Sequence, residues 1–380
     1  MRLGVPKHTH AKVRGLDGPQ IVKLVEPSEL GAFFPADRCL LQTSLGWQGR
    51  IGGQVVSVED IKLPEAMVAG DVVRLRPDGT LINVLWRRGD RSNTLFTTER
   101  CNSLCVMCSQ PPRDVDDQWR VDELLQVIPL IDKDETQLGV TGGEPTLLGD
   151  GLTQVLGACR HELPKARLHV LTNGRQFRHA QEAKEWIQAG GQQTTWAVPL
   201  YADVADVHDE VVAAPGAFDE TLDGLYQLAV NGAQVEIRVV LHAMAIPRLR
   251  QLAAFIYRRL PFVEHVALMG LEPMGFAKGN RDRLWIDPAD YVDALADAVG
   301  FLANRKMRVS IYNLQLCILP RSLWPFARQS ISEWKNRFAP PCDDCVVRDH
   351  CAGFFTSANN EWRSQKIKSL TLEELSHALA

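Results

Sequence analysis

The sequence has 380 residues, of which 45% are hydrophobic and 23% are charged, an ordinary composition for a globular chain of two or three domains. Its 42 lysines and arginines nearly balance 46 aspartates and glutamates, and no block of like charge predicts a nucleic-acid groove or a membrane surface. The first residues lack the apolar core of a signal peptide and no apolar run is long enough to span a bilayer, so we expect a cytoplasmic protein with neither nucleic-acid nor membrane partners.

Residues 1–91 predict a small β-rich domain. Short β-type runs, such as GGQVVSVEDI, MVAGDVVRLR and GTLINVLW, are separated by glycine, proline and aspartate. Pro-Asp-Gly at 77–79 is a strong turn signal. We interpret the basic stretch of Arg87, Arg88 and Arg91 as a solvated linker, and we expect no chemistry from this domain.

From residue 92 onward the pattern changes to six alternating strands and helices. Such a repeat predicts parallel strands joined by right-handed crossovers, and both an open doubly wound sheet and a barrel-like arc fit it. Asp287 and Pro288 are typical of a helix start, with aspartate as the cap and proline in the first turn. The expected strands are 93–98, 137–142, 167–172, 194–201, 234–241 and 265–271, and the expected helices are near 119–131, 151–162, 179–190, 216–231, 248–260 and 288–306.

Distinctive motifs follow the expected strands at their carboxyl ends, where ligands gather in both architectures. Three cysteines follow the first strand, Gly142-Gly143-Glu144-Pro145 follows the second, and Thr172-Asn173-Gly174 follows the third. Tyr201 and Asp203 follow the fourth strand, and Glu272 follows the sixth. Motifs scattered at random would not all fall on one rim.

The nine cysteines are clustered rather than evenly spread. In a reducing compartment, clustered cysteines are more often metal ligands or catalysts than disulfides. Only Cys39 and Cys159 are isolated, and we interpret each as a buried hydrophobic residue or an exposed bystander.

The first cluster, Cys101, Cys105 and Cys108, has the spacing C-x3-C-x2-C in a loop. Such a loop can place each thiolate on a separate iron of a four-iron cluster and leave the last iron open to an exogenous ligand. An open position makes a site catalytic rather than sealed, as it does for zinc. A zinc ion is the alternative occupant, and it would need a fourth nearby cysteine or histidine.

Together these features resemble the radical SAM superfamily over roughly residues 92–355. The signature of that superfamily is C-x3-C-x2-C after the first strand of a partial β/α barrel, and Met107 stands where an aromatic residue usually precedes the last cysteine. The resemblance implies an α/β fold with a partial (β/α)6 TIM-like barrel at 92–308. It also implies a [4Fe–4S] cluster that binds S-adenosyl-L-methionine and receives electrons from an external donor such as flavodoxin or ferredoxin.

The resemblance also implies which residues meet the cofactor. The motif Gly142-Gly143-Glu144-Pro145 would meet the methionyl amino group through its backbone and its acidic side chain, since an ammonium needs acceptors and glycines allow close approach. Asn173 would line the ribose and carboxylate end of the cofactor. Arg238 would contact the carboxylate, and a structural ion pair is the other explanation for an arginine in a strand. Packing and solubility are open explanations for Tyr201 and Glu272.

The second cysteine cluster, Cys342, Cys345 and Cys351, has the spacing C-x2-C-x5-C, and Cys317 can supply a fourth thiolate. Four sulfurs seal a site, and zinc is again the alternative. We interpret the neighbouring His350 as lying beside the site rather than as a ligand. After a radical SAM core, the segment resembles the twitch domain, the short form of the SPASM domain. This implies one auxiliary [4Fe–4S] cluster in a cysteine-rich domain at 309–360, followed by a helical tail at 361–380.

Within the superfamily, the run NTLFTTERCNSLCVMCSQPP at 93–112 most resembles the radical SAM maturase of the His-Xaa-Ser peptide system, HxsC. That resemblance implies a ribosomally synthesised precursor peptide as substrate and a second radical SAM maturase as a partner. Two alternatives stay open: a radical SAM enzyme acting on a small molecule or another protein, and a zinc-binding scaffold without catalysis. No side chain can be named as a catalytic acid or base.

Overall fold

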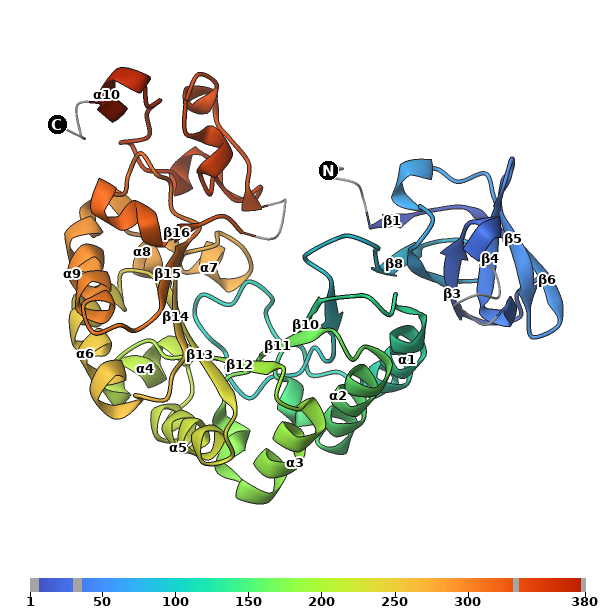
Figure 1. The fold of residues 1–380 in the computed structure, drawn as a ribbon, viewed down its shortest axis with the longest axis horizontal. Coiled ribbons are helices and arrows are strands. Elements are labelled where there is room, and N and C mark those ends of the chain that lie inside the picture. The colour runs from blue at the N-terminus through green and yellow to red at the C-terminus, as the bar shows by residue number, and fades with distance from the viewer. Residues whose placement is uncertain (1–6, 30–35, 331–334, 377–380) are drawn as a thin grey trace.

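The computed structural model describes residues 7–29, 36–330 and 335–376. The described residues form two sheets of eight strands each, which lie side by side and are drawn in blue and in green to orange in Figure 1.

The first sheet contains every β-type run that the sequence predicted before residue 91. Its order is β1 (His8–Thr9), β8 (Ile82–Trp86), β7 (Val72–Leu75), β3 (Gln20–Val25), β4 (Cys39–Thr43), β5 (Gly46–Ile51), β6 (Gln54–Glu59) and β2 (Lys12–Arg14). All neighbours are antiparallel except β3 and β4. Since β1 and β2 are adjacent in sequence but pair at opposite ends of this order, the sheet must curl back on itself around an apolar core.

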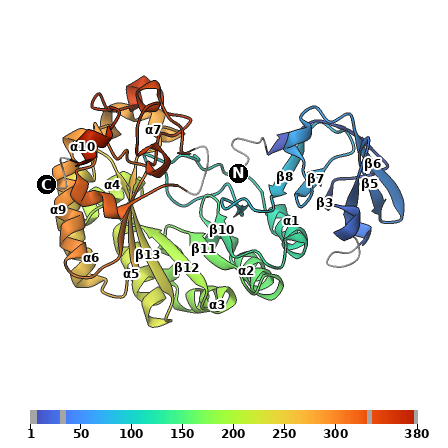
Figure 2. The same ribbon diagram turned by 45° about the horizontal axis from the view of Figure 1, so that its top comes forward.

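The second sheet is entirely parallel, which confirms the α/β prediction. Its helices lie on the convex face of a curved sheet (Figures 1 and 2). The strands, in order across the sheet, are β9 (Thr94–Phe96), β10 (Gln137–Thr141), β11 (Arg167–Leu171), β12 (Thr194–Pro199), β13 (Gln234–Leu241), β14 (His265–Gly270), β15 (Val309–Tyr312) and β16 (Ala327–Arg328). The helices are α1 (Trp119–Val127), α2 (Asp150–Glu162), α3 (Ala180–Gly190), α4 (Ala205–Val212), α5 (Ala217–Val230), α6 (Leu249–Arg259), α7 (Phe276–Gly279), α8 (Arg281–Leu284) and α9 (Val292–Ala303).

Strand β13 shows how the sequence divides the two faces of this sheet. Val235, Ile237 and Val239 are buried in the core that the helices share. Because side chains alternate along a strand, Glu236 and Arg238 point to the opposite, concave face. The concave face therefore carries polar groups, and the carboxyl ends of all eight strands meet at one rim.

The helix predicted at 288–306 starts at the expected residue. The Asp287 carboxylate accepts a hydrogen bond from the Ala289 amide at 2.9 Å, as a cap should. A 3-10 turn over Pro288–Asp290 comes first, and α9 follows from Val292.

The structure contains two strands and a helix that the sequence analysis did not predict. The parallel sheet continues beyond residue 308, because β15 pairs with β14 and β16 pairs with β15. Both strands are too short for their periodicity to be recognised. Helix α4 was also missed, because a helix of eight residues barely repeats its apolar pattern.

In the basic stretch expected to be a solvated linker, Arg91 is exposed, whereas Arg87 and Arg88 form ion pairs. Arg87 pairs with the fully buried Asp71 at 2.9 Å, and Arg88 pairs with Asp132. The Lys23 side chain, which is 0% exposed, reaches the same Asp132 at 2.8 Å. Since Lys23 belongs to the first sheet and Asp132 follows α1, these ion pairs join the two sheets.

The cysteine-rich region beyond β15 is built mostly of turns and 3-10 helices. These are η9 (Arg321–Phe326), η11 (Pro340–Cys342), η12 (Arg348–His350) and η13 (Asn360–Trp362), followed by α10 (Leu372–Ser376). Residues 377–380 of the expected helical tail lie outside the described residues. Among the described helices, none combines the length and the apolar character needed to cross a membrane.

Candidate metal and cofactor site

The first three cysteines lie on the loop that leaves β9 at the carboxyl rim. Cys101, Cys105 and Cys108 are free and half-buried. Burial raises the pKa of Cys101 to about 11 and that of Cys105 to about 12, and the neighbouring cysteines raise both further. The three sulfurs therefore lie within electrostatic reach of one another. Thiols with such pKa values lose their protons at neutral pH only when a metal binds.

Gly142 and Gly143 hold the start of this loop. The Gly143 amide donates to the Thr98 carbonyl at 2.6 Å, and a Cβ on Gly143 would lie 2.1 Å from the Arg100 carbonyl oxygen. Both glycines thus closely approach the segment 98–100, which leads into Cys101.

The Glu144 side chain is enclosed by protein groups. It is fully buried, and its carboxylate accepts hydrogen bonds from the Thr146 amide at 3.0 Å, the Thr172 hydroxyl at 2.7 Å and the Asn173 amide at 2.6 Å. Burial raises its pKa, and these hydrogen bonds act against that rise. The carboxylate joins the segments that follow β10 and β11. Pro145 begins the 3-10 turn that follows and is also buried.

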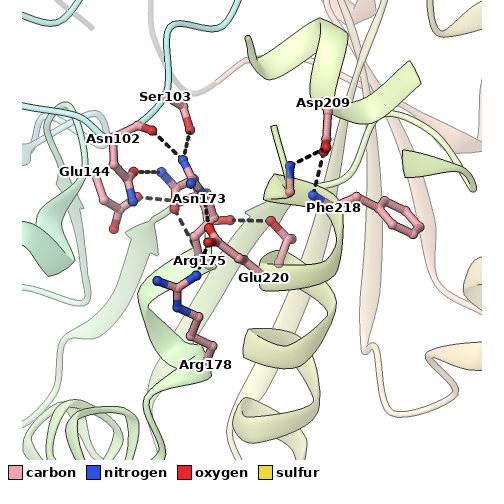
Figure 3. Close-up of polar contacts among 12 residues, drawn as sticks. Asn102, Ser103, Glu144, Asn173, Arg175, Arg178, Asp209, Phe218 and Glu220 are labelled. Carbon is pink, nitrogen blue, oxygen red and sulfur yellow. Dashed lines mark hydrogen bonds and ion pairs between the residues drawn. The ribbon is translucent and has the colours of Figure 1, made fainter. Parts of the chain in front are cut away.

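The segment after β11 contacts the cysteine loop directly, as Figure 3 shows. The Asn173 side-chain amide donates to Asn102 Oδ1 at 2.5 Å and lies 3.9 Å from the Cys101 sulfur. Arg175, which the sequence analysis did not single out, donates to the Asn102 carbonyl and to the Ser103 hydroxyl. The structure therefore places Asn173 beside the cysteines.

The second half of the loop is attached to later elements of the sheet. The amides of Leu104 and Val106 donate to carbonyls at the end of α4, and the Phe276 amide donates to the Cys108 carbonyl at 2.8 Å. Gly275 has a φ of +57°, and a Cβ there would lie 2.3 Å from the Cys108 carbonyl oxygen. Sequence reasoning missed this contact, although a glycine shortly after the sixth strand was a usable signal.

Tyr201 lies beneath the cysteine loop. Burial raises its pKa, and the nearby Cys105 and Cys108 raise it further. Met107 is buried in the same apolar cluster, so it serves as packing for the loop. The ring of His242, at the end of β13, lies 5.9 Å from the Tyr201 ring, and burial lowers its pKa to about 4.

Arg238 is held by protein groups on the concave face. Its Nη1 donates to Glu236 Oε1 at 2.9 Å, and its Nη2 lies 3.0 Å from the Met269 sulfur. Glu236 also binds His265 at 2.7 Å. The structural ion pair that the sequence left open for Arg238 is present, and its side chain is still 27% exposed.

The remaining rim residues are engaged in ion pairs. Asp203 accepts two hydrogen bonds from Arg248, at 2.7 and 2.8 Å. Glu272 lies 3.4 Å from the Lys335 ammonium in the cysteine-rich region. Both residues link segments of the protein, in agreement with the packing explanation for Glu272.

Four further cysteines gather in the C-terminal region. Burial raises the pKa of Cys317 and of Cys351, and Cys342 and Cys345 add to both rises. The Leu316 amide lies 3.5 Å from the Cys351 sulfur. Backbone amides aimed at sulfur are typical of iron–sulfur sites. His350 is exposed.

Both cysteine sets supply free thiols, which are the ligands that hold iron–sulfur clusters. No three Cys, His, Asp or Glu side chains in the part of the chain that the structure describes converge on one metal position.

A comparison with family models matches the part of the chain that carries the first cysteine set. Residues 95–256 match the model of the Radical SAM superfamily. These residues form a radical SAM domain. The match begins in β9 and ends in α6, so it contains the first three cysteines, Gly142–Pro145, Asn173 and Arg238. No curated protein matches the sequence.

Solved structures similar to this chain include radical SAM proteins. Streptococcus suis SuiB bound to S-adenosylmethionine has 14% identity and a TM-score of 0.46, over 64% of this chain and 54% of that one. The protein anSMEcpe with bound AdoMet and Kp18Cys peptide has 16% identity and a TM-score of 0.45, over 74% and 78%. HemN from Escherichia coli has 16% identity and a TM-score of 0.42, over 56% and 52%. The chain thus spans only about half of SuiB.

Proposed function

We propose that this chain is a radical SAM enzyme whose [4Fe–4S] cluster is held by Cys101, Cys105 and Cys108 and cleaves S-adenosyl-L-methionine reductively. The observation that carries the proposal is the gathering of three free thiols at the rim of a radical SAM domain. When bound, the cluster supplies the electron that breaks the S–C5′ bond, which yields a 5′-deoxyadenosyl radical able to abstract hydrogen from a substrate.

The residues of the chain have three tasks in this reaction. Glu144 and Asn173 fix the cysteine loop by hydrogen bonds that need no metal. Arg238 offers a partly exposed cation on the concave face, which suits a cofactor carboxylate. The buried apolar cluster of Val106, Met107 and Tyr201 excludes water from beneath the loop.

We further propose a precursor peptide of the His-Xaa-Ser type as the substrate. The resemblance of residues 93–112 to such maturases supports this proposal. The gathered thiols of Cys317, Cys342, Cys345 and Cys351 support an auxiliary [4Fe–4S] cluster, which could accept the electron left on an oxidised substrate. A second radical SAM maturase and an external electron donor such as flavodoxin or ferredoxin complete the proposed system.

The first test is reconstitution of the anaerobic full chain with iron and sulfide, followed by reduction with dithionite and S-adenosylmethionine. We expect 5′-deoxyadenosine from the wild type and none from a variant with alanine at all three rim cysteines. Cys159→Ala is the matched control, since Cys159 is buried in α2 and is expected to leave the yield unchanged. Product from the triple variant would contradict the proposed cluster site.

The substrate is tested separately by adding a His-Xaa-Ser repeat peptide and analysing it by mass spectrometry. We expect a mass change that depends on S-adenosylmethionine. Formation of 5′-deoxyadenosine without any change in the peptide would contradict the peptide proposal and leave the cluster proposal standing.

A further inference from the structure

Arg175 is enclosed between the cysteine loop and helix α5 (Figure 3). It opens the turn η6 (Arg175–Arg178), directly after Gly174, whose φ is +80°. Its Nη1 donates to the Asn102 carbonyl and, at 3.0 Å, to the Ser103 hydroxyl. Its Nε donates to Glu220 of α5 at 2.6 Å, and its side chain is only 13% exposed. One guanidinium thus binds the backbone between the first two cysteines and a carboxylate behind it.

The charge of Arg175 lies beside the segment between Cys101 and Cys105 and acts on the Cys105 sulfur. Burial and the other two cysteines raise the pKa of Cys105, and Arg175 acts in the opposite direction by favouring the thiolate. Glu220 limits this effect because its negative charge lies on the far side of Arg175 from the loop. Glu220 also pairs with Arg178, whose side chain is more exposed at 38% and has no hydrogen bond to the loop among the described residues.

We propose that the Arg175–Glu220 pair sets the reduction potential of the cluster on Cys101, Cys105 and Cys108, with Arg175 raising it and Glu220 lowering it. This inference rests on the proposed function. In the step concerned, one electron passes from an external low-potential donor to the cluster, and no bond forms or breaks. A cation fixed beside a centre that gains negative charge stabilises the reduced form, and net charge and hydrogen bonds near the sulfurs are known levers on such potentials.

The proposal predicts that substitutions of Arg175 and of Glu220 shift the reduction potential in opposite directions. In Arg175→Met the cation is lost and Glu220 remains, so the potential should become more negative. We expect the ratio of reduced to oxidised cluster at a fixed ambient potential to fall about tenfold, which equals 59 mV for one electron. In Glu220→Gln the cation loses its counter-charge while the amide oxygen can still accept its hydrogen bond, so the ratio should rise.

The measurement is an anaerobic redox titration of the reconstituted full chain, followed by the electron paramagnetic resonance signal of the reduced cluster. Arg178→Met is the matched control, because it removes the other partner of Glu220 without touching the loop, and we expect a much smaller shift. Arg175→Lys keeps the charge and loses the guanidinium fork, so it should stay near the wild-type potential. If Arg175→Met fails to bind iron, Arg175→Lys and Glu220→Gln decide the question.

Shifts of the same sign in the Arg175→Met and Glu220→Gln variants, or no shift in Glu220→Gln, would overturn the inference. A wild-type chain that binds no iron and sulfide on reconstitution would instead overturn the proposed function, so the two failures are distinguishable.

Discussion

Glu144 connects two segments of the candidate site through one buried side chain. Its carboxylate is 0% exposed and accepts hydrogen bonds from two segments that follow different strands. The buried N–H and O–H groups around this carboxylate need its oxygens as hydrogen-bond acceptors, because a buried donor without an acceptor costs free energy. One side chain therefore determines where Asn173 lies, and Asn173 in turn contacts the cysteine loop.

We predict that Glu144→Gln destabilises the chain although it preserves the shape of the side chain. The new amide group would donate towards groups that are themselves donors, and the loss should be about 1–3 kcal/mol in the free energy of unfolding. Urea denaturation of the metal-free protein measures it. The control is Glu182→Gln, on the exposed face of α3, which should change the free energy of unfolding by less than about 0.5 kcal/mol. An equal loss in both variants would show that the hydrogen bonds of Glu144 do not stabilise the fold.

At the scale of elements, the parallel sheet could be predicted because its strands are long apolar runs. Within β13 (Gln234–Leu241), Val235, Ile237 and Val239 are apolar and buried at every second position, and such a pattern is visible in sequence. The contacts between loops could not be predicted in this way. The approach of Gly143 to Arg100 and of Gly275 to Cys108 depends on how the strand ends converge in space, and no local pattern contains that information.

We predict that Gly143→Ala impairs both stability and cluster binding. Its Cβ would lie 2.1 Å from a backbone oxygen, so the segment entering the cysteine loop must move. The free energy of unfolding should fall by about 1–3 kcal/mol, and the iron content after reconstitution should fall with it. Gly157→Ala in α2 is the matched control, because nothing lies within 4 Å of its Cβ, and it should gain about 0.5–1 kcal/mol. Unchanged iron content in Gly143→Ala would contradict the packing argument.

At the scale of the whole molecule, the two sheets are joined by buried charge. Lys23 from the first sheet and Arg88 from the connecting segment both pair with Asp132, and the Lys23 ammonium lies 4.3 Å from the centre of the Trp86 ring. The sequence suggested a solvated linker here, because arginines next to one another usually face water. The partner, Asp132, is 44 residues from Arg88, and a pairing over that separation is invisible to local reasoning.

This junction predicts an unusual dependence of stability on pH. Burial lowers the pKa of Lys23 from 10.5 to about 8, and Asp132 only partly offsets the change. Between pH 8 and 10.5 the unfolded chain therefore binds more protons than the folded chain, so this residue makes the folded state more stable as pH rises. Relative to Lys23→Met, the wild-type free energy of unfolding should rise by roughly 1–3 kcal/mol across that range.

Denaturant titrations at several pH values measure this difference. Lys184→Met, at an exposed position of α3, provides the control and should give a flat profile against the wild type. A difference for Lys23→Met that stays constant or falls with pH would show that the lysine is not buried as a cation between the sheets.

The path of the cysteine loop has a mechanical consequence for the radical SAM domain. The loop leaves β9 and bonds in turn to the ends of β10 and β11, to α4, and to the segment after β14. The loop is therefore attached to both halves of the curved sheet. A change in the curvature of the sheet would move the points where the loop is attached. It would thereby change the spacing of Cys101, Cys105 and Cys108. Closure of the domain around a bound molecule would thus also move the three cysteine sulfurs.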